Sequence, residues 1–270
     1  MRRIVHMSDV HFGRTDSNSV ERVVEIANEL EPHLVVVSGD LTQRARSSQF
    51  IEARAFLDRL PQPQIVVPGN HDVPMYNVYK RFVEPLKNYK KYITSDLFPF
   101  FQDDEMAVIG INTARSLTIK DGRINEKQVN EVKAKMYALD DGVMKIVVTH
   151  HPFDLPGGYD EDDIVDRAEE MMPKIAESGA DIFLAGHLHV SSITDSAHRY
   201  RLEGGRSALI IQAGTATSTR GRGEANSFNL IELERPFLTV KRYECSLAPN
   251  GFMLATTEQF TQTERGWSRM

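Results

Sequence analysis

The sequence contains little that could cross-link the chain or anchor it in a membrane. It has one cysteine among 270 residues, Cys245, which excludes an internal disulfide. Cys245 stands in a strand-like run, which predicts a small buried or half-buried side chain and not a nucleophile. No apolar run approaches the roughly 20 residues that cross a bilayer, so no membrane span is predicted. Positive charge is not in excess, and a formal net charge of −6 argues against binding to long nucleic acid.

A secretory signal is also missing. Arg2 and Arg3 make the start of the chain basic, but only four or five apolar residues follow before Asp9. A secretory apolar region needs roughly 7 to 15 residues, so we expect a retained N-terminus and a cytoplasmic protein. There is no internal repeat, and the length fits one large domain or one and a half ordinary domains.

Three apolar segments near the N-terminus each end at polar side chains. The segments 4–7, 34–37 and 65–67 are followed by Asp9 and His11, by Asp40, and by Asn70, His71 and Asp72, respectively. Asp9, Asp40 and Asn70 are spaced at 31 and 30 residues, about the length of a strand, a helix and a returning parallel strand. Open α/β sheets bind their ligands at the carboxyl ends of the strands, so these side chains are predicted to converge there.

The segments between and after these strands continue an α/β pattern. Helical spacing of apolar residues predicts helices near 19–30 and 48–60, which complete a βαβαβ unit. Two later apolar runs, 144–148 and 181–185, end in His150-His151-Pro152 and in Gly186-His187-Leu188-His189. The chain beyond Ser191 is predicted to be rich in strands. We expect a folded domain over residues 1–246 and a polar surface excursion over 247–270.

Residues 74–101 interrupt this pattern with many aromatic and basic side chains. One interpretation is a set of helices that pack on the sheet and expose a solvated basic face. The other is a cap that faces the substrate, because Tyr76, Tyr79 and nearby basic groups would suit a nucleobase and its phosphate. The sequence leaves both interpretations open.

Five short polar blocks follow apolar strands in order along the chain. They are Asp9-x-His11, Gly39-Asp40, Gly69-Asn70-His71-Asp72, His150-His151-Pro152 and Gly186-His187-x-His189. Each block alone is weak, because such pairs arise by chance and a lone histidine is usually structural. Together, over residues 4–245, they resemble the calcineurin-like metallophosphoesterases.

This resemblance implies a fold and a metal site. The fold would be an α/β, four-layer α-β-β-α sandwich of two mixed sheets with flanking helices. One ion would be held by Asp9, His11, Asp40 and His189, and the other by Asp40, Asn70, His150 and His187. Asp40 would then bridge the two ions. Imidazole, carboxylate and amide ligands without thiolate suit two divalent transition metal ions, namely Mn²⁺, Fe, Zn²⁺, Co²⁺ or Ni²⁺.

The resemblance also implies a mechanism, in which a metal-bound hydroxide attacks phosphorus in line with the leaving group. His71 would protonate the leaving group, and Asp72 would orient His71 or a metal ligand. His151 would either contact the substrate or pack against its neighbours. The hydroxyl-rich stretch 214–220 would either border the site, with Arg220 on a phosphate, or form an ordinary turn.

Within the superfamily the chain looks most like the bacterial cyclic-nucleotide phosphodiesterases, on its length, its His150-His151-Pro152 block and the lack of an appended domain. We therefore expect a metal-dependent phosphodiesterase whose partner is a small, cyclic nucleotide or a similar diester. Phosphomonoesterases, glycerophosphodiesterases and nucleotide pyrophosphatases share the five blocks and stay open as alternatives. The negative net charge disfavours a nuclease, and the full set of seven ligand residues disfavours a metal-free interaction module. A homo-oligomer is left open.

Overall fold

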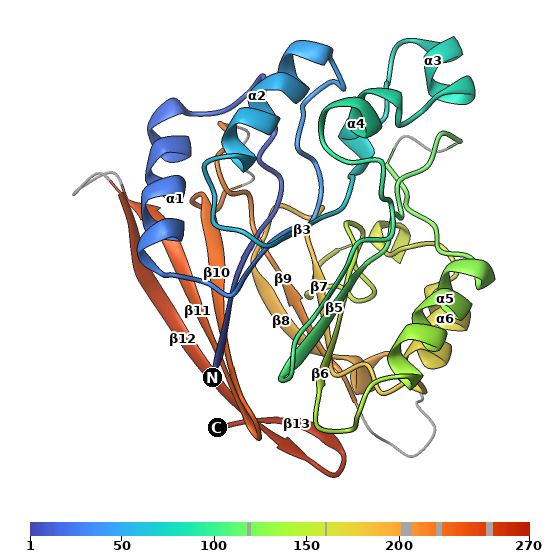
Figure 1. The fold of residues 1–270 in the computed structure, drawn as a ribbon, viewed down its shortest axis with the longest axis vertical. Helices are drawn as coiled ribbons and strands as arrows, with labels where there is room; N and C mark the ends of the chain where they lie inside the picture. Colours follow the sequence, from blue (N-terminus) through green and yellow to red (C-terminus); the bar gives the residue numbers. More distant parts are fainter. Residues whose placement is uncertain (118–119, 160, 201–206, 220–222, 247–250) are drawn as a thin grey trace.

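The computed structural model describes residues 1–117, 120–159, 161–200, 207–219, 223–246 and 251–270. In this part of the chain the strands form two mixed sheets that face each other, with helices on both outer sides (Figure 1). The first sheet has the order β13-β12-β11-β10-β1-β2-β3, and the second has the order β4-β5-β6-β7-β9-β8. The predicted four-layer α-β-β-α sandwich is confirmed.

The first sheet is parallel in one half and antiparallel in the other. Its parallel strands are β1 (Arg2–Met7), β2 (Leu34–Val37) and β3 (Gln64–Val66). Its antiparallel strands are β10 (Ser227–Glu234), β11 (Phe237–Ser246), β12 (Gly251–Thr263) and β13 (Gly266–Arg269). Because β1, β2 and β3 pair in parallel, the loops that follow them lie at one edge of the sheet.

The second sheet is parallel at its centre and antiparallel at both edges. Its central strands are β5 (Met106–Gly110), β6 (Met144–Val148), β7 (Ile182–Ala185) and β9 (Leu209–Gln212). Its edge strands are β4 (Phe100–Gln102) and β8 (Ser192–Asp195). The central strands read as nearly continuous apolar runs because both of their faces are buried.

Helices cover the outer face of each sheet. The first sheet is covered by α1 (Ser17–Glu29), α2 (Ser47–Leu57) and α4 (Lys87–Tyr92), and the second by α5 (Glu126–Tyr137) and α6 (Ala168–Ala176). Two of these helices begin at side-chain caps, since Asp16 accepts from Ser19 N and Asn125 accepts from Gln128 N. Short 3₁₀ turns span Asn70–Asp72, Glu161–Asp163 and Ser196–His198. In the described ranges, no helix combines the length and the apolar character that crossing a bilayer would require.

The core that joins the two sheets is built from the inward side chains of their parallel strands. Ile4, Val36 and Val67 from the first sheet share one apolar cluster with Ile146 and Leu184 from the second. This cluster fixes the two sheets against each other. The loops after β1, β2 and β3 are thereby held beside the loops after β6 and β7.

The prediction of a polar excursion at 247–270 is wrong for the described residues 251–270, which form β12 and β13 of the first sheet. Phe252, Phe260 and Trp267 point into the apolar clusters and are buried. Trp267 Nε1 also donates to the carbonyl oxygen of Asp181, at the start of β7 (3.0 Å). The exposed residues of β12 are mixed, with threonine and glutamine beside Met253 and Leu254, so no clear apolar–polar alternation marks the strand in the sequence.

Residues 74–101 divide into a packed part and an exposed part. In α4, Tyr89 is fully buried and its hydroxyl donates to the carbonyl oxygen of Val66 (3.0 Å). In contrast, α3 (Val78–Val83) stands outside the layers, and Tyr79 and Phe82 on it are exposed. The packing interpretation therefore holds for α4, while α3 presents aromatic rings to solvent.

Candidate metal centre

Seven polar side chains from five loops meet at the carboxyl ends of the parallel strands. They are Asp9 and His11 after β1, Asp40 after β2, Asn70 after β3, His150 after β6, and His187 and His189 after β7. All seven are less than a tenth exposed. The structure thus brings together every residue that the sequence suggested as a metal ligand.

The first group consists of Asp9, His11, Asp40 and His189, whose ligand atoms all lie within 4.8 Å of one another. Asp9 Oδ1 lies 3.3 Å from His189 Nε2 and 3.6 Å from His11 Nε2. Asp40 Oδ2 lies 3.7 Å from His11 Nε2. Within the described residues, neither of these two buried carboxylate oxygens accepts a hydrogen bond. Buried, unpartnered carboxylate oxygens beside imidazole nitrogens are an arrangement that a cation would complete.

The second group is centred on the side-chain oxygen of Asn70. Asn70 Oδ1 lies 3.1 Å from His150 Nε2 and 3.2 Å from His187 Nδ1. Asp40 Oδ1 lies 3.5 Å from the same His150 nitrogen. His150 Nδ1 donates to the carbonyl oxygen of Ser38 (2.8 Å), so Nε2 of the neutral ring carries a lone pair. Acceptors of imidazole, amide and carboxylate type therefore face one another, which fits a divalent transition metal.

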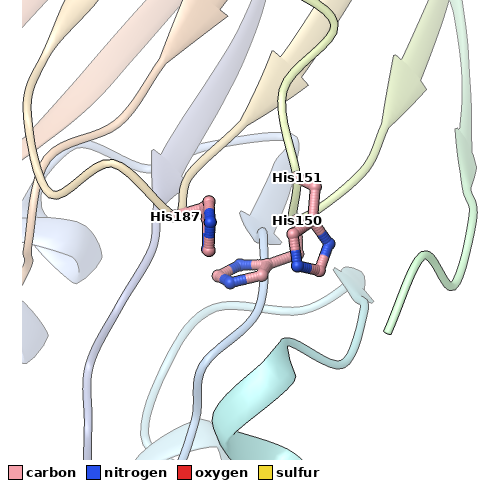
Figure 2. A group of neighbouring side chains, drawn as sticks. All are labelled: His150, His151 and His187. Carbon is pink, nitrogen blue, oxygen red and sulfur yellow. The ribbon is translucent and has the colours of Figure 1, made fainter. Parts of the chain in front are cut away.

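His151 lies beside this second group, and Figure 2 shows its ring together with those of His150 and His187. The His151 ring centroid is 4.8 Å from that of His150 and 4.6 Å from that of His187. Both ring nitrogens have protein partners, since Nδ1 bonds to the Thr113 hydroxyl (2.8 Å) and Nε2 to the carbonyl oxygen of Lys120 (2.9 Å). These contacts favour the packing role for His151.

Five of the seven proposed ligands have an uncommon backbone conformation. The left-handed region of φ contains Asp9 (54°), His11 (51°), Asp40 (52°), His187 (75°) and His189 (64°). Non-glycine residues visit this region rarely, and clusters of them occur at functional sites. Here the conformation turns successive side chains inward at the ends of the strands.

Two glycines allow the loops to approach one another. Gly39 has a φ of +99°, and a Cβ at this position would lie 2.5 Å from His150 Nδ1. A Cβ at Gly69 would collide with the side chain of Asp40. The glycines in the Gly39-Asp40 and Gly69-Asn70 blocks are therefore required by close approach of the ligand loops.

The electrostatics of the site favour positive charge. Burial alone would raise the pKa of Asp40, but the charges of His150 and His71 hold it well below its usual range. Burial lowers the pKa of His150, but the charge of Asp40 outweighs this effect and raises the pKa to about 9. Burial lowers the pKa of His187 to about 3, so this imidazole keeps its lone pair. The site thus favours a proton on His150 Nε2, and a cation bound beside Asp40 would replace this proton and leave the neutral ring with its lone pair.

His71 and Asp72 follow Asn70 in the 3₁₀ turn but have different surroundings. The His71 ring packs edge-on against His11 at 4.9 Å between centroids, and its Nδ1 donates to the carbonyl oxygen of Gln43 (3.0 Å). Asp72 accepts from the backbone of Leu41 (3.1 Å) and Thr42 (2.9 Å). Asp72 thus holds the loop after Asp40, and these bonds do not involve the His71 ring. Burial and the charge of Asp40 raise the pKa of Asp72 to about 6.

The residues suggested as substrate contacts lie in different surroundings. Tyr76 and Tyr79 are 73% and 71% exposed, and Arg44 lies over the ring of Tyr76 at 4.7 Å. Arg220 lies outside the described residues. Its neighbour Thr217 donates its hydroxyl to the carbonyl oxygen of Val10 (2.8 Å), which places the described part of that stretch against the loop between Asp9 and His11.

The groups that hold the histidines could not be predicted from the sequence. The carbonyl of Ser38 orients His150, the hydroxyl of Thr113 binds His151, and the carbonyl of Gln43 binds His71. Backbone carbonyls leave no signal in residue type. Thr113 could have been found only from its position at the end of a strand that neighbours β6.

Two mixed sheets with carboxylates and imidazoles at the carboxyl ends of their parallel strands define the class of protein as a metallophosphoesterase. The chain belongs to the calcineurin-like phosphoesterase family, whose family model matches residues 2–191. This family consists of metal-dependent phosphoester hydrolases, and it typically binds two divalent ions.

Solved structures support the fold assignment. A purple acid phosphatase from yellow lupin superposes with a TM-score of 0.68 at 12% identity, covering 96% of this chain and 53% of that one. A dimetal phosphatase from Danio rerio superposes with a TM-score of 0.66 at 14% identity, covering 95% of this chain and 98% of that one. At these identities the likeness concerns the fold alone.

Two curated proteins share a shorter stretch of sequence. A transmembrane protein with a metallophosphoesterase domain from Danio rerio is 40% identical over 76 residues, which are 26% of this chain and 16% of that protein. Glycerophosphodiester phosphodiesterase GpdQ from Enterobacter lignolyticus is 38% identical over 80 residues, which are 26% of this chain and 29% of that protein. The matches thus span less than a third of either relative.

Proposed function

We propose that the protein is a dinuclear metal-dependent phosphodiesterase that hydrolyses a small nucleotide diester. One ion is assigned to Asp9, His11, Asp40 and His189, and the other to Asp40, Asn70, His150 and His187. Asp40 serves both groups because its two oxygens face different histidines, Oδ2 toward His11 and Oδ1 toward His150.

The observation that carries the proposal is a pair of buried carboxylate oxygens beside imidazole nitrogens. Among the described residues, Asp9 Oδ1 and Asp40 Oδ2 are buried and accept no hydrogen bond. Leaving a buried polar group unpaired costs about 1 to 3 kcal/mol, and more for a charged group, so a cation bound at these oxygens would stabilise the arrangement. Metals in these positions would bind phosphate oxygens and lower the pKa of a water molecule.

The chain itself contributes the positioning of the ligands and of a proton donor. Ser38 fixes the orientation of His150, and Asp72 ties the loop of Asp40 to that of Asn70. His71 is assigned as the general acid that protonates the leaving oxygen. Its Nδ1 is engaged by Gln43, so proton transfer to the leaving group would proceed from Nε2.

Glycerophosphodiesters are the second candidate substrates. The specific observation in their favour is the 38% identity to GpdQ, whose name gives it as a glycerophosphodiester phosphodiesterase. A screen with reconstituted metals against cyclic nucleotides, glycerophosphodiesters and phosphomonoesters separates these candidates by kcat/KM.

The dinuclear assignment is tested by Asp40→Ala. Because this carboxylate is the shared ligand, the variant should lose both ions and its turnover of bis(4-nitrophenyl) phosphate should fall to background. Metal content by elemental analysis and initial rates are compared with those of Asp58→Ala, which removes an exposed carboxylate on the surface. Two equivalents of metal and normal turnover in a folded Asp40→Ala protein would contradict the assignment.

A further inference from the structure

A pocket of about 610 Å³ lies between α4, the loop after β5 and the N-terminus of α5. Its walls include Lys87 and Lys90 from α4, Asn112 and Arg115 from the loop, and Gln128 from α5. This volume is in the range of sites that accept a nucleotide-sized group. None of the proposed metal ligands lines it.

The pocket is connected to the metal centre through both of its walls. Thr113, between two residues that line the pocket, bonds to His151, whose ring touches those of His150 and His187. The opposite wall belongs to the segment that begins directly after His71 and Asp72. Arg81 joins the two walls, because its guanidinium is buried and donates to the carbonyl oxygens of Pro74 (3.2 Å) and Ser116 (2.7 Å). The pocket and the candidate metal centre therefore share two segments of the chain, which makes the pocket a candidate site for a substituent on the reacting phosphorus.

The pocket has cationic groups without carboxylate partners. Lys87 pairs with Glu84, but among the described residues neither Lys90 nor Arg115 has a carboxylate within 4.0 Å. Arg115 is half-buried, and burial and then the charge of nearby Arg123 lower its pKa, while the more distant carboxylate of Asp166 opposes this effect only in part. A half-buried guanidinium without a partner is costly unless an anion binds to it.

A second pocket nearby also contains arginines, but these have carboxylate partners. This second pocket, of about 690 Å³, lies beside α6 and also contains arginines, Arg167 and Arg199. There the charges are satisfied within the protein, since Arg167 pairs with Glu170 and Arg199 pairs with Asp154. Unpaired positive charge is thus a property of the pocket lined by Arg115.

We propose that the pocket lined by Lys90 and Arg115 is a subsite for a second anionic group, a phosphate or carboxylate, on the substrate. The N-terminus of α5, a helix of 12 residues, borders the pocket at Asn125 and adds favourable dipole charge. This inference rests on the proposed function and narrows it. The substrates are diesters in which one organic group carries its own negative charge, in contrast to cyclic nucleotides with a single phosphate.

The subsite is tested by ligand binding to the metal-loaded protein. Dissociation constants of adenosine 5′-phosphate and adenosine 3′,5′-bisphosphate are measured by calorimetry. The second phosphate should tighten binding by about tenfold or more in the wild type, as expected for a charge-assisted contact to a guanidinium. The ratio of the two constants should fall toward one in Arg115→Ala and recover in part in Arg115→Lys. Lys90→Ala, at an exposed residue, should reduce the ratio as well and covers the case in which Arg115→Ala fails to fold.

The matched control is Lys127→Ala, which removes the same charge from an exposed position on α5 outside the pocket. Its ratio should equal that of the wild type. Equal binding of the two ligands by the wild type, or an equal loss in Lys127→Ala, overturns the subsite. Hydrolysis of bis(4-nitrophenyl) phosphate is measured in parallel, so that a failure of the proposed function, with no metal-dependent turnover, is distinguished from a failure of the subsite.

Discussion

At the scale of single residues, both the backbone and the ring of His71 are held beside the candidate metal centre. The backbone N–H donates to Asp40 Oδ1 (2.8 Å), while the ring is held by Gln43 and packs against His11. The ring therefore has a fixed position beside the proposed ions. Such a placement suits proton transfer.

We predict that His71→Ala retains both metals and loses kcat by roughly 10² to 10⁴ for a nucleotide diester, because proton donation to a poor leaving group is lost. The loss should be smaller for bis(4-nitrophenyl) phosphate, since nitrophenolate needs little protonation. Metal analysis and kcat with both substrates check this prediction, with the exposed His33→Ala as control. Equal losses on good and poor leaving groups would argue against the role of general acid.

The convergence of the proposed ligand residues could be predicted at this scale because each follows an apolar strand, where residue type and position agree. The groups that orient them could not. Ser38 acts through its carbonyl, and Thr113 and His151 become partners only when β5 and β6 pair. Contacts of this kind depend on strand pairing between distant segments, which residue type does not encode.

At the scale of elements, the start of α1 depends on Asp16. Asp16 Oδ2 accepts from the backbone N–H (2.8 Å) and the hydroxyl (2.7 Å) of Ser19. These bonds, the hydroxyl first, hold the pKa of Asp16 below its usual value. We predict that Asp16→Ala lowers the free energy of unfolding by about 1 kcal/mol at pH 7.

The pH dependence of this loss has a definite sign. A carboxylate whose pKa is lower in the folded state stabilises the fold above its unfolded pKa, and the contribution is lost as the pH falls through the folded value. The difference between wild type and Asp16→Ala should thus be full at pH 7 and shrink below about pH 4. Asp16→Asn keeps the acceptor and should lose little at either pH. Denaturant titrations that show a constant difference down to pH 3 would refute the assignment.

The exposed helix α3 permits a test of the substrate-facing interpretation. Tyr76 and Tyr79 are too exposed to contribute much to stability, so their replacement should leave the protein folded. If they stack on a base, worth about 1 to 3 kcal/mol, the double variant to Ala should raise KM for a nucleotide diester more than for bis(4-nitrophenyl) phosphate. Tyr137→Ala, at an exposed ring on α5, is the control. An unchanged ratio of the two KM values would remove both tyrosines from the substrate site.

At the scale of the whole molecule, the C-terminal strands link the two sheets. Gln262 Nε2 donates to Asp181 Oδ1 (2.8 Å), and Ser207 N donates to the carbonyl oxygen of Arg265 (2.8 Å). Together with Trp267, these contacts join β12 and β13 to the beginnings of β7 and β9.

We predict that Trp267→Ala destabilises the protein by about 3 to 5 kcal/mol, because a buried aromatic ring is lost from the core between the sheets. Trp267→Phe should retain most of this stability and lose chiefly the hydrogen bond to Asp181, worth about 1 kcal/mol. Urea unfolding measures both changes. A stability of Trp267→Ala equal to that of the wild type would show that β13 does not join the sheets.

The four layers could be predicted because the parallel strands are short apolar runs and the helices have a clear apolar face. The antiparallel extension at β12 could not, since polar and apolar residues are mixed on its exposed side and only two of its side chains, Phe252 and Phe260, are buried. Strand formation there depends on pairing with β11, which is a tertiary effect and overrides local polarity.

The left-handed backbone at Asp9, His11, Asp40, His187 and His189 has a consequence for stability. Each such residue costs roughly 1 kcal/mol relative to glycine, so a glycine at one of these positions would relieve backbone strain while it removes a proposed metal ligand. Stability and activity are therefore expected to change in opposite directions when these five residues are replaced by glycine.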